Sequence, residues 1–144
     1  MENQNYANHR RIIPLFHVVT FFTIVLLIVG AVVNLCMSFG NHDRLYSASL
    51  ILIISIILIF FFFFFRGFAL RAQDRAIRAE ENLRHFVLTG KLLDKKLSIR
   101  QVIALRFASD EEFVELAGKV ASSDMKPNEI KQAIKNWKGD YHRV

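Results

Sequence analysis

Two long apolar runs in the first half of the chain constrain its fold more than any other feature. They cover about residues 15–37 and 45–65, and a short polar stretch separates them. An α-helix rises about 1.5 Å per residue, so about 20 residues are needed to cross a hydrocarbon core about 30 Å thick, and each run has that length. The sequence therefore predicts two transmembrane helices that form a hairpin.

Composition supports a division of the chain into an apolar part and a charged part. Hydrophobic residues make up 53% of the sequence and charged residues 22%, with a mean hydropathy of +0.28. Because the charged fraction is ordinary while the apolar fraction is high, we expect the two populations to be segregated along the chain. The expected order is a cytoplasmic N-terminal segment (1–11), transmembrane helix 1 (12–37), a short external loop (38–44), transmembrane helix 2 (45–65), a cytosolic extension helix (66–88) and a C-terminal helical domain (89–144).

The basic residues predict the orientation of this hairpin. Lys and Arg near the ends of a span stay on the cytoplasmic side, and the loop between the runs has only Arg44, beside Asp43. We expect both termini to be cytoplasmic. A cleaved signal peptide is the disfavoured alternative, because the first run is too long for one and a second run follows it directly. The arginines expected at the anionic membrane surface, each gaining about 1 kcal/mol there, are Arg10, Arg11, Arg66, Arg71, Arg75 and Arg78.

The second apolar run ends in six consecutive phenylalanines, residues 60–65, immediately before Arg66. Phe lacks the polar tip that holds Trp and Tyr at the membrane interface, so it belongs slightly deeper in the bilayer. We interpret the six residues as a lipid-facing collar. The alternative is a stacking surface for a partner span.

A helical pattern continues beyond Arg66. Apolar residues recur at alternating spacings of three and four, the pattern of a seam along which one helix packs on another. The positions are Phe62, Phe65, Ala69, Ala72, Ala76, Ala79, Leu83 and Phe86. Asp74 with Arg78, and Glu80 with Arg84, are spaced to form i,i+4 ion pairs on the exposed side. The partner of the seam is either a second copy of the chain or the chain's own later helices, and the sequence leaves both open.

Two capping signals predict short helices in the last third of the chain. Ser98 with Gln101, and Ser109 with Glu112, fit the capping box, in which a hydroxyl and a side chain three residues later satisfy the first free amides of a helix. We expect helices at about 99–107 and 110–121.

A third short helix is expected to begin near Pro127 and to continue until Gly139 ends it. The C-terminal domain is then a small bundle of about three helices. Trp137 and Tyr141 are our candidates for docking a partner on this domain. The predicted fold class is therefore all-α: a two-helix transmembrane hairpin, a second helix extended into the cytosol, and this bundle.

Four separated segments, residues 4–11, 68–75, 105–112 and 130–144, resemble in order a bacterial family of small two-span membrane proteins, the domain of unknown function 6526. The resemblance covers essentially the whole chain. It implies a two-span topology and a bacterial inner membrane, and it implies no activity, cofactor or substrate.

Residue patterns for chemistry point away from an enzyme. The five histidines are scattered and the single cysteine has no partner in the chain, so we predict no metal site, no cofactor, no catalytic residues and no small-molecule substrate. The favoured hypothesis is a non-enzymatic adaptor or accessory subunit that binds a protein partner or a further copy of itself. The alternative is a membrane-tethered regulator that binds nucleic acid, because residues 66–144 hold sixteen Lys and Arg against eleven Asp and Glu, a net charge of +5.

Overall fold

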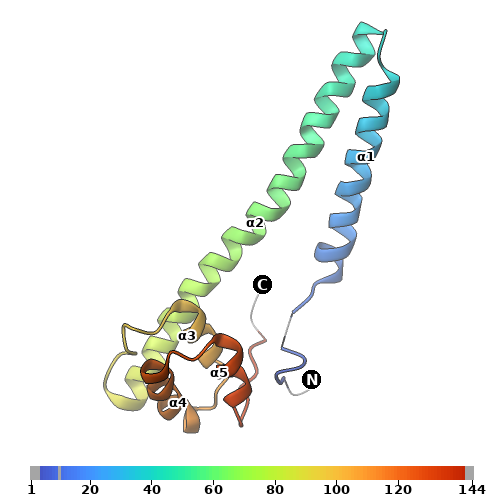
Figure 1. Cartoon of the computed structure of the whole chain (residues 1–144). Coiled ribbons are helices and arrows are strands. Elements are labelled where there is room, and N and C mark those ends of the chain that lie inside the picture. Colours follow the sequence, from blue (N-terminus) through green and yellow to red (C-terminus); the bar gives the residue numbers. More distant parts are fainter. Residues whose placement is uncertain (1–3, 10, 142–144) are drawn as a thin grey trace. The chain divides into compact units, whose positions relative to one another are not determined.

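The structure is a computed structural model that describes residues 4–9 and 11–141 (Figure 1). Throughout these residues the regular secondary structure is helical, without strands, which confirms the predicted all-α class. The order is a short π-helical segment η1 (Leu15–Thr20), α1 (Phe21–Met37), α2 (His42–Thr89), α3 (Ile99–Leu105), α4 (Asp110–Ser123) and α5 (Pro127–Ala133). The chain divides into two compact units, which we call the hairpin (Ile12–Phe68) and the end domain (the N-terminal residues through Arg11, with the chain from Ala69 onward).

The hairpin consists of η1, α1 and the first half of α2, and small side chains lie at its inner contact. Ala31, Ala48 and Ser55 are buried there. Near the other end of this contact the Phe62 ring stacks on Phe16 with centroids 4.5 Å apart, and it lies 5.7 Å from the ring of Phe21. Six of the non-exposed positions of α2 in this unit recur at spacings of three and four: Leu45, Ala48, Leu52, Ser55, Ile59 and Phe62.

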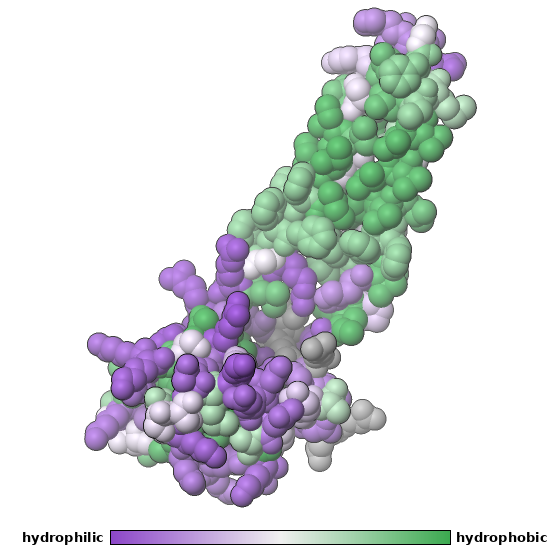
Figure 2. All heavy atoms as spheres, viewed as in Figure 1, coloured by the Kyte–Doolittle hydropathy of each residue, from purple (hydrophilic) through white to green (hydrophobic). Residues whose placement is uncertain are grey.

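Most of the large apolar side chains of the hairpin face outward. Leu15–Met37 and His42–Thr89 are both long and apolar enough to cross a membrane. Figure 2 shows hydrophobic residues gathered over α1 and the first half of α2. Of the six phenylalanines, Phe62 is half-buried against the first helix and the other five are exposed. A hairpin with this exterior has the composition of a lipid-facing structure.

The end domain has a conventional hydrophobic core. Its largest fully buried side chains are Phe107, Phe113, Leu105, Ile130, Val102 and Val120. They come from α3, α4, α5 and the turn after α3, and Leu93 and Leu97 from the connection after α2 complete the cluster. Because α3, α4 and α5 are short, their stability depends on packing against one another rather than on helix propensity alone.

The ends of α2 and α3 follow from local sequence signals. Gly90 has φ +72°, a left-handed conformation that costs glycine little, and α2 ends one residue before it at Thr89. The capping box predicted for α3 is confirmed: Gln101 N–H donates to the Ser98 hydroxyl, and Ser98 N–H donates to the Gln101 side chain at 2.8 Å. The predicted helix at 99–107 ends earlier, at Leu105.

The second predicted capping box does not form. Ser109 does precede α4, but its hydroxyl makes no cap hydrogen bond. The Glu112 carboxylate instead accepts the backbone N–H groups of Lys135 and Asn136, at 3.2 and 3.0 Å. Glu112 therefore ties the segment after α5 to the start of α4.

The third predicted helix is correct at its start and wrong at its end. Pro127 occupies the first turn of α5, but the helix stops at Ala133 because Ile134 adopts an extended conformation. The chain then runs antiparallel to the turn after α3, where Ala108 and Trp137 form an isolated β-bridge. Lys138 N–H donates to the Phe107 carbonyl at 2.7 Å in this pairing. The residues after Ala133, which the sequence pattern predicts as a continued helix, therefore form a short bridge instead. We call them the closing segment of the domain.

Candidate interaction surface

One face of α2 packs on the rest of the end domain. Ile77 and Glu81 are only 6% and 8% exposed, and Leu70, Gln73 and Arg84 are half-buried. These positions recur at spacings of three and four, so they lie along one side of the helix. This side is the intramolecular face of α2.

Arg84 attaches this face to the bundle. Its guanidinium donates to Glu81 at 3.0 Å, to Asp110 at 2.5 Å and to the carbonyl of Ala108 at 2.7 Å. It also lies over the Phe113 ring, 4.2 Å from the centroid. A planar group with five donors suits such a multiply bonded, partly buried position. The predicted i,i+4 pair of Arg84 with Glu80 is wrong, because Arg84 turns to Glu81 and the bundle.

The two acids that pair with Arg84 have opposite environments. Burial raises the pKa of the Glu81 carboxyl above its usual value, although the hydrogen bond and charge of Arg84 oppose this. The Arg84 hydrogen bond lowers the pKa of the exposed Asp110 carboxyl. Both carboxyl groups therefore bind the Arg84 guanidinium, one in a buried and one in an exposed position.

The opposite face of α2 is the predicted seam, which we call the α2 seam. Its members within the end domain are Ala69, Ala72, Ala76, Ala79, Leu83 and Phe86. Leu83 is 63% exposed and Phe86 50%, and Ala72, Ala76 and Ala79 are also exposed. The later helices of the chain therefore pack on the intramolecular face, leaving most of the α2 seam uncovered.

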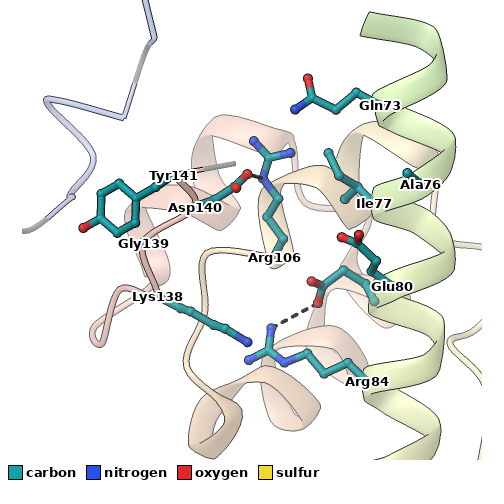
Figure 3. Close-up of a pocket in the computed structure, with 11 residues that line it drawn as sticks. Gln73, Ala76, Ile77, Glu80, Arg84, Arg106, Lys138, Gly139, Asp140 and Tyr141 are labelled. Atoms are coloured by element: carbon teal, nitrogen blue, oxygen red, sulfur yellow. Dashed lines mark hydrogen bonds and ion pairs between the residues drawn. The ribbon is translucent and has the colours of Figure 1, made fainter. Parts of the chain in front are cut away.

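A cleft of about 380 Å³ lies beside the intramolecular face, between α2 and the closing segment of the domain (Figure 3). Its lining includes Glu80, Glu81 and Arg84 from α2 and Lys138 from the closing segment. Arg106 Nε lies 3.1 Å from an Asp140 carboxylate oxygen. The charges of both signs balance within the cleft, and the described residues contain no group of three His, Cys, Asp or Glu that could hold a metal ion.

The N-terminal segment packs on the end domain. The His9 ring lies 5.8 Å from that of Phe107 and 5.9 Å from that of Trp137, centroid to centroid. The side-chain oxygen of Gln4 accepts the N–H of Asp140 at 2.8 Å. The sequence contains no signal for this contact, because it joins residues more than a hundred positions apart.

The two candidate docking residues differ in their surroundings. Trp137 is half-buried, and its ring lies 5.0 Å from that of Phe107. Tyr141 is exposed, and its carbonyl accepts a hydrogen bond from Arg11 at 3.2 Å. Trp137 thus contributes to packing within the chain, and docking by either residue stays a prediction.

The arginines predicted at a membrane surface occupy several environments. Arg71 and Arg75 are exposed, Arg78 is half-buried, and the Arg66 guanidinium lies 5.9 Å from the centroid of the Phe16 ring. Arg10 lies outside the described residues.

The model of a family of unknown function, DUF6526, matches residues 1–144. Neither a curated protein nor a solved structure matches the chain.

Proposed function

The chain belongs to this family of unknown function, and we propose that it is a non-enzymatic adaptor or accessory subunit anchored in the bacterial inner membrane. The observation that carries the proposal is the exposed α2 seam, an apolar helix face with a folded domain on its opposite side. A face of this kind binds another helix, because burying its side chains removes apolar surface from water.

Membrane anchoring is supported by the exterior of the hairpin. Side chains such as Leu26 and Phe63 are exposed there, as are most of their large apolar neighbours. Each would cost about 1.5–3 kcal/mol in water relative to an apolar environment, so a lipid bilayer is the solvent that stabilises this unit.

The proposed orientation places both ends of the chain in the cytoplasm. Residues on both sides of the hairpin, such as His9 and Trp137, pack in one unit, which requires that both lie on the same side of the bilayer. The excess of arginine near that unit supports the cytoplasmic side, where these residues face anionic headgroups.

The nucleic-acid alternative has less support and stays a prediction. Of the lysines near the last helix, Lys131 is half-buried, with its ammonium 3.1 Å from the His9 ring nitrogen and 5.8 Å from the centroid of the Phe107 ring. A phosphate-binding lysine would need to extend into solvent.

The proposal is tested by disrupting the α2 seam in the full chain. We expect the wild-type protein, extracted in a mild detergent after cross-linking in cells, to migrate as an assembly larger than one chain. The double variant Ala72→Gln, Ala76→Gln should migrate as a single chain while remaining in the membrane fraction. Arg71→Gln, which adds the same side chain at an exposed position off the seam, serves as the matched control. An assembly unchanged in the double variant would remove the seam from the proposed function.

A further inference from the structure

We propose that the α2 seam binds the same seam of a second copy of this chain, as a parallel and in-register pair of helices. This inference rests on the proposed function, because it names the partner of the surface described there. It follows from the phase of the helix, from two charged side chains that flank the seam, and from the shared membrane.

The helix phase separates the centres of the two faces, and only Ala76 of the seam, at its edge, also lines the cleft beside the intramolecular face. If Ala69, Ala76 and Leu83 are the a positions of a heptad, then Ala72, Ala79 and Phe86 are its d positions. At about 100° per residue, the centre of this stripe lies roughly opposite Ile77 and Glu81, the most buried residues of α2 in the end domain. A second helix can therefore approach the seam from the side opposite these buried residues.

Two exposed charges flank the stripe, one on each side. Arg75 is the g position of this heptad and Glu80 is the next e position, five residues later. In a parallel pair, the g position of one helix faces the e position of the following heptad in the other helix. Arg75 of each copy therefore faces Glu80 of the other copy, which gives two ion pairs related by symmetry. Among the described residues, neither side chain forms an ion pair within its own chain. An antiparallel pair would instead oppose like charges, which is unfavourable.

The membrane imposes the same parallel direction. Two copies inserted with the same topology present α2 running the same way out of the bilayer. The seam spans only residues 69–86, which is short for helices that meet in dilute solution. Confinement to one membrane raises the effective concentration and so compensates for the short contact.

The residues of the seam suit close helix pairing. Alanines at four of the six positions allow the two helices to approach closely. Leu83 and Phe86 add large apolar side chains at one end, and both are at least half exposed in the single chain. The second copy therefore covers two of the four large apolar side chains that α2 exposes in the end domain, the others being Val87 and Leu88.

Cysteine cross-linking in isolated membranes tests the geometry with the full chain. In a Cys36→Ser background, Ala76→Cys places a thiol at an a position, which faces its own counterpart across a parallel dimer axis. Arg71→Cys places one at an exposed position off the seam and serves as the control. With a mild oxidant we expect roughly tenfold more disulfide dimer from Ala76→Cys than from Arg71→Cys, because only the former holds both thiols within bonding distance.

A charge exchange in the same background tests the two ion pairs. Glu80→Arg should lower the Ala76→Cys cross-linked fraction roughly fivefold, because both pairs become repulsive. Adding Arg75→Glu restores opposite charges across the dimer, and cross-linking should recover. If the double exchange stays as low as the single one, Arg75 and Glu80 do not face each other and the parallel register is wrong.

One further readout separates this inference from the proposed function. A photoreactive amino acid at position 76 forms an adduct with whatever covers the seam in cells. An adduct of twice the chain's own mass, containing only its peptides, supports the second copy. An adduct containing another protein overturns the second copy but leaves the adaptor proposal standing, and the absence of any adduct overturns both.

Discussion

The hairpin and the end domain differ in where they place their large apolar side chains: the hairpin exposes most of them, and the end domain buries many of them in its core. The end domain buries Phe107 and Phe113 completely inside its own core. The hairpin leaves Phe63 and Phe64 more than half exposed and buries mainly small side chains at its inner contact. The difference supports the proposal that one chain is built for two solvents, in which the hairpin depends on an external apolar medium and the end domain supplies its own core.

The same contrast occurs on a smaller scale across α2. Within the end domain, the intramolecular face of this helix carries a partly buried arginine with several partners, whereas the α2 seam carries small and exposed apolar residues. A helix that only completes its own domain needs one packing face, here the intramolecular face. The exposed apolar α2 seam on the other side therefore indicates a partner.

The largest effect is expected from removing a core phenylalanine. Phe113→Ala should destabilise the end domain by about 3–5 kcal/mol, because it leaves a cavity in a packed core. Phe63→Ala, the same change at an exposed hairpin position, should leave the unfolding of the end domain unaltered. Thermal unfolding of the detergent-solubilised chain can be followed by the fluorescence of Trp137, the only tryptophan, which lies in the end domain. Equal effects of the two changes would remove the distinction between the units.

Removing Arg84 should have the next largest effect. Arg84→Ala leaves the buried Glu81 carboxylate without its cation and should cost about 3 kcal/mol. Arg75→Ala, on the same helix but exposed, should change the free energy of unfolding of the single chain by less than about 0.5 kcal/mol. Adding Glu81→Gln to Arg84→Ala should recover part of the loss, and the same fluorescence measurement checks all three variants. No recovery would mean that the buried charge is not the source of the cost.

The pH dependence of stability should distinguish the two acids around Arg84. Burial raises the pKa of Glu81, so this carboxyl takes up a proton at a higher pH in the folded state than in the unfolded state. The destabilising negative charge of buried Glu81 is therefore lost as the pH falls toward 4.5, the pKa of this group in the unfolded state. Asp110 has a lowered pKa, so its contribution is present above 3.8 and is lost as the pH falls below that value. Relative to Glu81→Gln, the wild-type chain should therefore gain stability between neutral pH and 4.5. A constant difference between them, measured by unfolding across this range, would contradict the buried state of Glu81.

The smallest effect is expected at the two serines that begin α3 and α4. Ser98→Ala removes a hydroxyl that caps α3 and should cost about 1 kcal/mol. Ser109→Ala removes a hydroxyl without a cap hydrogen bond and should cost clearly less. Unfolding of the two variants compared side by side provides the measurement. Equal losses would mean that the difference between the caps has no energetic consequence.

Sequence reasoning predicts the features that depend on local pattern. The apolar runs, the end of the extension helix near residue 88 and the capping box at Ser98 depend on neighbouring residues, and all three agree with the structure to within a residue or two. The phase of the α2 seam was also evident, because spacings of three and four define a helix face wherever the helix lies. The pattern does not indicate which face of α2 packs on the rest of the chain.

The features that escaped prediction depend on contacts between distant residues. The spacing of Glu112 predicts a helix cap, yet its carboxylate accepts the backbone N–H groups of Lys135 and Asn136. The spacing of Trp137 predicts that it continues α5, yet it pairs with Ala108 in a bridge. The packing of His9 on Trp137 has no local signal at all. In each case tertiary contacts determined the outcome.

Spin-label accessibility in lipid vesicles would test the contrast between the units most directly. Single labels placed along α2 of the full chain report collisions with oxygen, which partitions into lipid, and with a water-soluble nickel chelate. At the exposed hairpin positions Ile53, Ile57 and Phe64 we predict strong oxygen collisions and weak chelate collisions, whereas a label at Arg71 should be accessible to the chelate. Strong chelate collisions at all the hairpin positions would mean that water surrounds this unit, and that the account of a chain built for two solvents is wrong.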